Sequence, residues 1–355
     1  MKSNKHRAIW NFTSLIIVFV MILSGCSAPS PTPSSSVSEP PSSAQPTTGN
    51  ESTSSSTTNT LISDTSPIEN VPNGEGLKIA LAMGTLTSDF NVGQHDGVVA
   101  ALEEAGVEIL DSNAAGDVTR HIANIENAIS AGVDAIIIGS ANASEMVAVV
   151  EKANAANIPV ISMDVAIPDA VAEITSDNHL LGIQMARYMV NAIGGKGKII
   201  SIWAPGYRAV EVRKEMLLEV LRDYPDIEII SEVPYVWPDT IPDAKAKVET
   251  ILRANPEAGS IAAVWVPFDL VGVGAAQAIM EAGRGDEVVI VGADGDDVAL
   301  DILKQDNSPF VATFAQDTFE MGRQSSIIAI LAAKNEPHPN LILIPTKLFT
   351  QDNTQ

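Results

Sequence analysis

Single carboxylates, amides and aromatic rings stand at or just after the short apolar runs of this sequence. Carboxylates accept hydrogen bonds from neighbouring hydroxyl groups, and ring faces stack on the C–H faces of a small hydroxylated molecule. We expect these side chains to contact such a ligand: Asp89, Phe90, Asn91, Asp164, Glu211, Trp237, Phe268, Asp269, Asp294 and Gln316. For each single carboxylate the alternative is a helix N-cap, which aspartate commonly supplies.

Three tryptophans lie in the second half of the chain, at predicted strand ends or in the loop 236–242. They are Trp203, Trp237 and Trp265. Trp237, inside that loop, is the best candidate for a ring that stacks on the ligand. Packing in the core or at a sheet edge is the alternative for all three.

The apolar runs alternate with Ala-rich stretches of helical spacing from residue 77 onward. The runs predicted as strands are Lys78–Met83, Ala135–Ile138, Pro159–Met163, Lys198–Trp203, Ile261–Val266, Val288–Val291 and Val311–Ala315. The predicted helices include Gly97–Ala105, Ile122–Ala131, Leu180–Ile193, Val210–Tyr224 and Ala244–Ala254. Fully apolar strands between amphipathic helices indicate parallel sheets covered on both faces. The predicted fold class is therefore α/β, with doubly wound parallel sheets.

A break near residues 176–178 divides this pattern into two halves of similar size. Two doubly wound sheets of this kind leave a cleft between them. Open α/β sheets bind ligands at the carboxyl ends of their strands. The polar residues that follow the strands are therefore expected to meet in the cleft.

Several motifs, in this order, resemble sugar-binding proteins of the ribose-binding type, which are type I periplasmic binding proteins. The motifs are Thr85-Leu86 with Phe90 ahead of Asp96-Gly97, the segment 158–164, Thr175-Ser176-Asp177-Asn178, the segment 291–295 and Thr313-Phe314-Ala315-Gln316. The resemblance extends from Leu77 to about Leu348.

The resemblance implies two α/β lobes joined by three crossover strands, which close on a ligand and deliver it to an ATP-driven importer. The crossings would fall near Asn178, Gln316 and about Leu341. The first lobe then comprises residues 77–178 and 317–340, and the second comprises 179–316 and 341–355. The expected partners are a small-molecule ligand, a monosaccharide in the first instance, and the permease and ATPase of an ABC transporter. We expect the binding protein to be a monomer with no cofactor and no bound metal.

Three positions depart from the family pattern. The family usually has an arginine directly after the aspartate of the fourth strand, where this chain has Val165. A second site arginine aligns with Glu211, with Arg213 two residues on, and a common asparagine is replaced by Phe268. A ligand with an apolar face, a deoxy position or a positive charge suits these exchanges better than ribose does.

The first 25 residues have the order of a secretory signal peptide. Three basic residues precede an apolar stretch from Leu15 to Ile22, which is shorter than the roughly 20 residues that cross a bilayer. Leu23-Ser24-Gly25 before Cys26, the only cysteine, resembles the bacterial lipobox, in which the thiol is acylated. We expect an extracytoplasmic protein anchored to the outer face of the cell membrane by lipidated Cys26. An ordinary signal peptide is the alternative.

Residues 26–76 are mostly Ser, Thr, Pro and Asn. Such a segment buries too little apolar surface to offset its ordering entropy, so we expect a disordered tether. The formal net charge of the chain is −23. A surface this acidic is repelled by nucleic acid and by anionic lipid head groups. We therefore expect no nucleic-acid partner and membrane contact through the lipid anchor only.

No catalytic motif supports an enzyme. The five histidines lack metal-ligand spacing, and neither a Gly-x-Ser-x-Gly elbow nor a Walker phosphate loop is present. The lac-repressor family shares the two-lobe core, but this chain has a leader and an acidic tether in place of a helix-turn-helix. Two alternatives stay open: a tethered receptor for a sensor kinase, and transport of a nucleoside, polyol or small amine.

Overall fold

The computed structural model describes residues 65–354. The predicted leader, Cys26 and the expected tether up to residue 64 lie outside the described residues. In the described range, no helix has both the length and the apolar character needed to cross a membrane.

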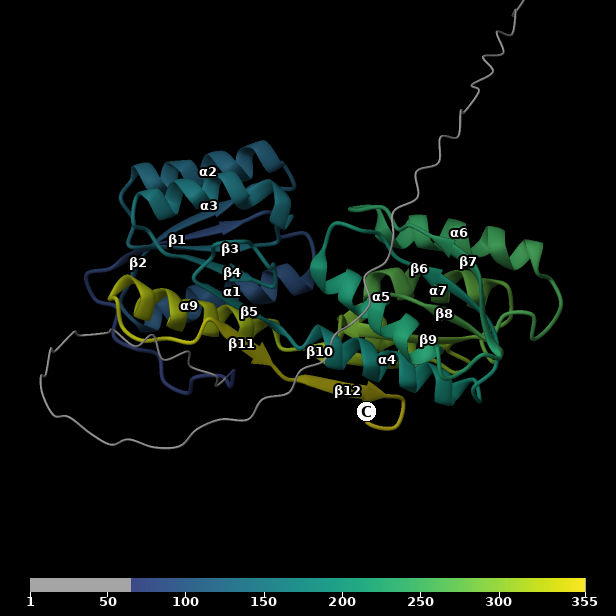
Figure 1. Cartoon of the computed structure of the whole chain (residues 1–355). Helices are drawn as coiled ribbons and strands as arrows, with labels where there is room; N and C mark the ends of the chain where they lie inside the picture. The colour runs from purple at the N-terminus through teal and green to yellow at the C-terminus, as the bar shows by residue number, and fades with distance from the viewer. Residues whose placement is uncertain (1–64, 355) are drawn as a thin grey trace, which may run out of the picture. The chain divides into compact units, whose positions relative to one another are not determined.

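The first lobe is a six-stranded parallel sheet in the order β11-β5-β4-β3-β1-β2. Its strands are β1 (Lys78–Met83), β2 (Glu108–Asn113), β3 (Ala135–Gly139), β4 (Val160–Met163), β5 (Ala172–Ser176) and β11 (Leu341–Ile344). Its helices are α1 (Asp89–Glu104), α2 (Val118–Ser130), α3 (Ala143–Ala155) and α9 (Thr318–Ala333). Helices α2 and α3 cover one face of the sheet, and α1 and α9 cover the other (Figure 1).

The second lobe repeats this plan in the order β12-β10-β9-β8-β6-β7, with β12 antiparallel to β10. Its strands are β6 (Gly197–Ile202), β7 (Ile227–Val233), β8 (Ala263–Trp265), β9 (Val289–Asp294), β10 (Phe310–Gln316) and β12 (Thr346–Thr350). Its helices are α4 (Asn178–Ala192), α5 (Arg208–Leu221), α6 (Thr240–Ala254), α7 (Asp269–Glu281) and α8 (Asp297–Leu303). One core lies between the sheet and α4 and α5, and another lies between the sheet and α6, α7 and α8.

The predicted α/β fold class is confirmed, and each of the seven predicted strands overlaps an observed strand. These strands are apolar because helices cover both of their faces. The prediction missed β2, β5, β7, β11 and β12. Four of these lie at sheet edges. In β2, β5 and β7, charged residues interrupt the apolar pattern.

The chain passes between the lobes three times, at Asp177, Asp317 and Pro345. The expected third crossing near Leu341 is wrong. Leu341–Ile344 pairs in parallel with Glu173–Ser176 of β5 and so belongs to the first sheet. The chain reaches the second sheet only after Pro345, where β12 pairs with β10.

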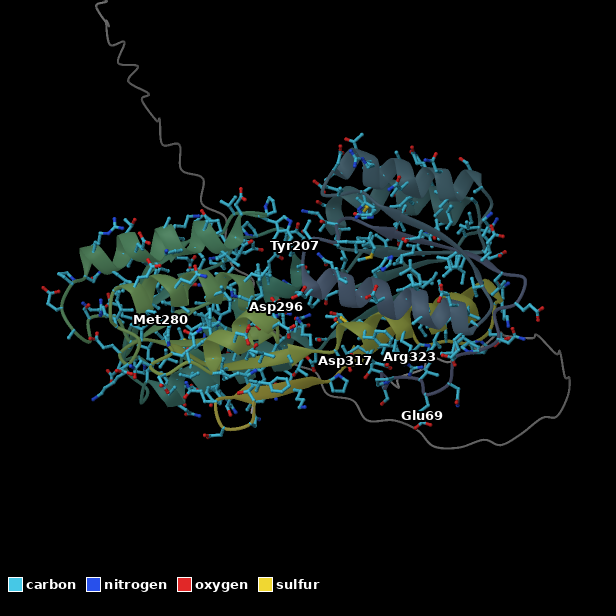
Figure 2. The ribbon with its side chains drawn as sticks, turned by 180° about the vertical axis from the view of Figure 1, so that it is seen from behind. Glu69, Tyr207, Met280, Asp296, Asp317 and Arg323 are labelled. Carbon is cyan, nitrogen blue, oxygen red and sulfur yellow. The ribbon has the colours of Figure 1, made fainter. Side chains whose placement is uncertain are left out.

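Residues 65–76 pack against the first lobe, so the expectation of a disordered tether up to residue 76 is wrong for this part. Ile68 exchanges two hydrogen bonds with the Gln324 side chain, at 2.9 and 2.7 Å. Arg323 donates to the carbonyl oxygens of Ile68 and Glu69. Arg323 and Glu69 lie close together in Figure 2. These bonds to α9 satisfy backbone groups of a segment that forms no helix or strand, and Ile68 and Val71 pack against the core of the lobe.

Helices α1 and α9 approach each other closely because glycines line their contact. A Cβ atom added to Gly97 would lie 2.0 Å from the carbonyl oxygen of Phe319, and one added to Gly322 would lie 2.1 Å from that of Gln94. No real Cβ contact is that short, so both positions exclude any side chain.

Replacing Gly97 with alanine is expected to destabilise the protein by about 1–3 kcal/mol, because α1 and α9 must move apart. The intrinsic helix preference of alanine, about 1 kcal/mol over glycine, acts in the opposite direction. Denaturant unfolding of Gly97→Ala measures the difference. Ala100→Met, on the exposed face of α1, is the control and should stay within about 0.5 kcal/mol of wild type. A gain of about 1 kcal/mol in Gly97→Ala, the helix preference acting alone, would contradict the close approach of the helices.

Candidate ligand-binding site

The two sheets point the carboxyl ends of their strands at one cavity of about 230 Å³. Pockets for drug-sized ligands span roughly 300–1,000 Å³, so this cavity suits a smaller molecule. The first lobe contributes the residues that follow β1, β2, β3 and β4, and the second lobe contributes those that follow β6, β7, β8, β9 and β10. Tyr207 and Asp296, both in the lining, lie where the lobes meet (Figure 2).

Seven of the ten residues predicted to contact a ligand line this cavity. They are Phe90, Asn91, Asp164, Trp237, Phe268, Asp294 and Gln316. The structure does not bring Asp89, Glu211 or Asp269 into the lining.

Asp164, at the end of β4, is held by a chain of hydrogen bonds that reaches the second lobe. Thr175 donates to Asp164 Oδ1 at 2.7 Å, and Asn178 Nδ2 donates to the Thr175 hydroxyl at 3.2 Å. Arg213 Nε donates to Asn178 Oδ1 at 2.9 Å. Asn178 begins α4 directly after the first crossing, so this chain of bonds passes through the segment that joins the lobes.

Asp294, at the end of β9, accepts a hydrogen bond from a residue beside the second crossing. Gln316 Nε2 donates to Asp294 Oδ1 at 2.6 Å, and Gln316 is the last residue of β10 before the chain crosses at Asp317. Arg213 Nη1 lies 4.0 Å from the same oxygen and donates to the carbonyl of Pro267 at 2.9 Å. The Arg213 side chain is only 3% exposed. Its buried guanidinium is therefore shared between the two strand-end aspartates.

The backbone at both aspartates is left-handed, with φ of 56° at Asp164 and 112° at Asp294. Residues other than glycine rarely adopt these angles, and each costs on the order of 1–3 kcal/mol. Such strain persists only where the surroundings fix the conformation. Here it turns each carboxylate from the strand into the cavity.

Burial raises the pKa of both strand-end carboxyls. For Asp164, the Arg213 charge and the Thr175 hydroxyl oppose this rise. For Asp294, the nearby Asp296 charge raises the pKa further, while Arg213 and Gln316 lower it. One guanidinium therefore partly neutralises two carboxylates that burial and mutual repulsion destabilise.

Asp296 adds a third carboxylate to the cavity wall. It is 7% exposed and precedes α8, but its side chain makes no capping hydrogen bond. Burial, followed by the charges of Asp89 and Asp297, raises the pKa of Asp296 to about 6.

The prediction that Asp269 contacts a ligand is wrong, because this residue lies entirely behind the cavity wall. Its carboxylate accepts hydrogen bonds from the Thr313 hydroxyl at 2.8 and 2.9 Å, and from the backbone N–H groups of Gly295 and Asp296 at 2.8 and 3.0 Å. A Cβ atom at Gly292 would lie 2.0 Å from its Oδ1 atom. Asp269 thus positions the turn that carries Asp296, and its own oxygens are already satisfied.

Glu211 and Asp89 are also displaced from the predicted site. Glu211 Oε1 accepts from the backbone N–H of Gly206 at 3.0 Å, because α5 presents Val210 and Arg213 to the cavity instead. Asp89 is exposed in the first turn of α1, where a negative charge interacts favourably with the helix dipole.

Aromatic rings from both lobes border the cavity. Phe90 comes from the first lobe, and Tyr207, Tyr235, Trp237 and Phe268 come from the second. Tyr235 and Phe268 pack edge to face, with ring centroids 5.1 Å apart. The other two late tryptophans lie outside the lining, and Trp265 is a core residue at 1% exposure.

Several buried acceptors in the lining have spare hydrogen-bonding capacity. Within residues 65–354, no hydrogen-bond partner reaches Gln94 Oε1 or Gln316 Oε1. Burial lowers the pKa of His121, and its Nε2 atom donates to the Ala82 carbonyl at 3.0 Å. The neutral ring therefore keeps Nδ1 as an acceptor. A ligand rich in donors, such as hydroxyl groups, would satisfy these atoms.

The sequence prediction missed several lining residues, above all Arg213, His121, Tyr207, Tyr235 and Asp296. The sequence pattern could have predicted that Arg213 is buried, because this residue lies three positions after Val210 on the buried face of a predicted helix. Tyr235 follows β7, a strand that the pattern did not show. Asp296 follows Gly295 at the end of a predicted strand, a pattern that indicates a turn and not a binding residue.

No group of three or more His, Cys, Asp or Glu side chains in the described part of the chain is placed to hold a metal ion. The lining instead combines carboxylates, amides, one guanidinium and aromatic rings.

Comparisons with known proteins agree with this geometry. A profile of the periplasmic binding protein domain matches residues 79–337. A xylitol-binding protein of Mycolicibacterium smegmatis is 28% identical over 248 residues, which are 69% of this chain and 69% of that protein. A ribose import binding protein of Bacillus subtilis is 25% identical over 285 residues, covering 79% of this chain and 90% of that protein.

A solved structure of an ABC transporter solute binding protein from Agrobacterium vitis with bound allitol superimposes with a TM-score of 0.76. It is 28% identical and covers 79% of this chain and 98% of its own. The chain belongs to the periplasmic binding protein family, and the predicted resemblance to its ribose-binding type is confirmed. The protein is a solute-binding protein of an extracytoplasmic family, not an enzyme.

Replacing Asp296 with asparagine is expected to stabilise the unliganded protein by about 1–3 kcal/mol at pH 7.5. A carboxyl with a pKa near 6 when folded and 3.8 as its ordinary value destabilises the fold fully above pH 6. This penalty shrinks as pH falls. The stabilisation of Asp296→Asn relative to wild type should therefore drop at pH 4.0 to a small fraction of its value at pH 7.5. Denaturant unfolding at both pH values measures it.

Asp301→Asn, an exposed acid of α8, is the control and should change stability by less than about 0.5 kcal/mol at both pH values. An equal gain from Asp296→Asn at pH 4.0 and 7.5 would show that packing, and not the buried charge, is responsible.

Proposed function

We propose that this protein captures a small sugar or polyol between its lobes and delivers it to an ABC importer. The observation that carries the proposal is the cavity at the strand ends. There Asp164, Asp294 and Arg213 converge from two lobes, and hydrogen bonds tie them to the first and second crossing segments. In the same proposal the protein acts as a monomer that binds one ligand.

The chemistry of the cavity supports a polyhydroxylated ligand. Its carboxylates and free amide oxygens accept hydrogen bonds, while its rings can cover C–H faces. Two relatives named above bind five-carbon molecules, xylitol and ribose, and the similar solved structure holds allitol. A cavity of about 230 Å³ is in keeping with molecules of that size.

The hydrogen bonds through the crossings support coupling between binding and lobe movement. Asn178 and Gln316 stand beside the points where the chain passes between the lobes, and each bonds a residue of the cavity. A ligand that pulls on Asp164 or Asp294 therefore acts on the hinge directly. Hinge closure around a ligand is a common movement of two-domain proteins.

A thermal-shift screen followed by calorimetry tests the proposal. The panel is xylitol, ribitol, allitol, ribose, apiose, allose and myo-inositol, with leucine and adenosine as unrelated solutes. Binding to folded protein alone raises stability by about 2.7 kcal/mol when the ligand stands at 100 times its Kd. We expect a clear rise in melting temperature with at least one sugar or polyol. A response confined to leucine or adenosine would contradict the proposal.

Asp294→Asn is expected to weaken binding of the best panel member by about 10- to 100-fold, because a buried hydrogen bond to a charged group contributes roughly 1.5–3 kcal/mol. Glu211→Gln is the matched control, since its carboxylate bonds Gly206 outside the cavity and glutamine keeps that acceptor. Its affinity should stay within twofold of wild type. Calorimetry that found equal losses in both variants, or none in Asp294→Asn, would place the ligand elsewhere.

The same proposal includes a lipid anchor at Cys26, which rests on the order of the leader segments and on the Leu23-Ser24-Gly25 run before the only cysteine. Attachment at this point would keep the protein beside the importer after the leader is removed.

Expression in a bacterial host fed with radiolabelled palmitate tests the anchor. We expect label on the wild-type protein in the membrane fraction, and unlabelled Cys26→Ser in the soluble extracytoplasmic fraction. Ser27→Ala, next to the anchor, should behave as wild type. Unlabelled wild-type protein in the soluble fraction would rule out the anchor and leave the solute-binding role intact.

A further inference from the structure

The cavity holds more negative charge than its cation neutralises. Asp164, Asp294 and Asp296 are buried or half-buried in its wall, and Arg213 is the one Lys or Arg side chain among its described lining residues. His121 does not add a charge at neutral pH, because burial lowers its pKa. Buried charges without partners are unfavourable. Asp117 and Glu145, both exposed, also line the cavity, so its acidic side chains outnumber its one guanidinium by five to one before a ligand binds.

Asp296 is the buried carboxylate of the lining without any compensating group. It is 7% exposed, and within residues 65–354 no hydrogen bond, ion pair or helix cap involves its side-chain oxygens. The charged groups that interact with it are all acids: Asp89 on α1, Asp294 at the end of β9 and Asp297 on α8. Behind it lies a further acid, Asp269. The Asp269 carboxylate accepts a hydrogen bond from the backbone N–H of Asp296 and makes none with the Asp296 side chain.

Arg213 does not compensate Asp296, because its printed contacts and its charge are directed to other groups. Its Nε atom bonds Asn178, and its Nη1 atom bonds the Pro267 carbonyl and lies 4.0 Å from Asp294. Its charge lowers the pKa of Asp164 and Asp294 but is not among the influences on Asp296. A hydroxyl group would give Asp296 a hydrogen bond but no opposite charge.

We propose that the natural ligand carries a protonated amine besides its hydroxyl groups, and that the ammonium group pairs with Asp296. This inference rests on the proposed function and narrows it from sugars and polyols to their amino derivatives. An ammonium group has three donors and no acceptor. It fits a wall whose Asp296 carboxylate and Gln94 and Gln316 oxygens lack donors. The chain's net charge of −23 also favours the approach of a cation over that of an anion.

The test compares neutral molecules with their amino counterparts by calorimetry at pH 7.0. The pairs are xylitol with 1-amino-1-deoxyxylitol, ribitol with 1-amino-1-deoxyribitol, sorbitol with 1-amino-1-deoxysorbitol, and glucose with glucosamine. In at least one pair, we expect the amine to bind 10-fold or more tightly than its neutral partner. In Asp296→Asn the ratio of the two affinities should fall below threefold. In the Asp301→Asn control it should stay within twofold of the wild-type ratio.

Other outcomes separate the inference from the function on which it rests. Neutral members that bind as tightly as the amines, or more tightly, would overturn the inference and leave a sugar or polyol binder. A preference for the amine that survives in Asp296→Asn would overturn the role of Asp296. Absence of binding by every member of the pairs and of the earlier panel would overturn both. Circular dichroism and melting of Asp296→Asn establish that the variant is folded.

Discussion

The buried guanidinium of Arg213 is the interaction on which the site depends. It lies 4.0 Å from Asp294 of the second lobe, and its charge lowers the pKa of that carboxyl and of Asp164 in the first lobe. Its hydrogen bonds to Asn178 and to the Pro267 carbonyl fix its position in the second lobe. Without this cation, Asp164 and Asp294 would face each other across the cavity as uncompensated buried charges, which proteins avoid by protonation or movement.

The fold supplies the positions that this cation holds together. Parallel strands bring their carboxyl ends to one edge of each sheet, so short loops from nine strands reach the same cavity. Left-handed backbone at Asp164 and Asp294 turns their side chains inward, and Asp269 holds the turn before α8. The close contact of α1 with α9, made possible by their glycines, fixes the first turn of α1 and with it Phe90 and Asn91.

The sequence predicted the fold class and the interior strands because burial on both faces leaves an unmistakable apolar run. It also identified Asp164, Asp294 and Gln316 as strand-end residues, and the structure places all three in the cavity. It could not separate them from Asp269, because the depth of a carboxylate behind a wall depends on packing between elements distant in sequence. The edge strands and the third crossing were misplaced or missed. Charged residues interrupt the apolar pattern of β7, and β11 is an apolar run of only four residues that is half-exposed.

Arg213 and Asp296 show a second kind of limit. A charged residue in a predicted helix or turn is normally interpreted as solvent-exposed, and only tertiary structure shows that these two are buried in the same cavity. Their unequal partners, several for Arg213 and none for the Asp296 side chain in the described chain, then suggest what the ligand must supply.

In the proposed function, a ligand binds between the lobes and draws them together through the crossings at Asp177, Asp317 and Pro345. Small-angle X-ray scattering tests it directly, with the protein alone and with a saturating concentration of the tightest ligand found by calorimetry. We expect a smaller radius of gyration in the bound state. An unchanged radius at demonstrated saturation would contradict closure of the lobes on the ligand.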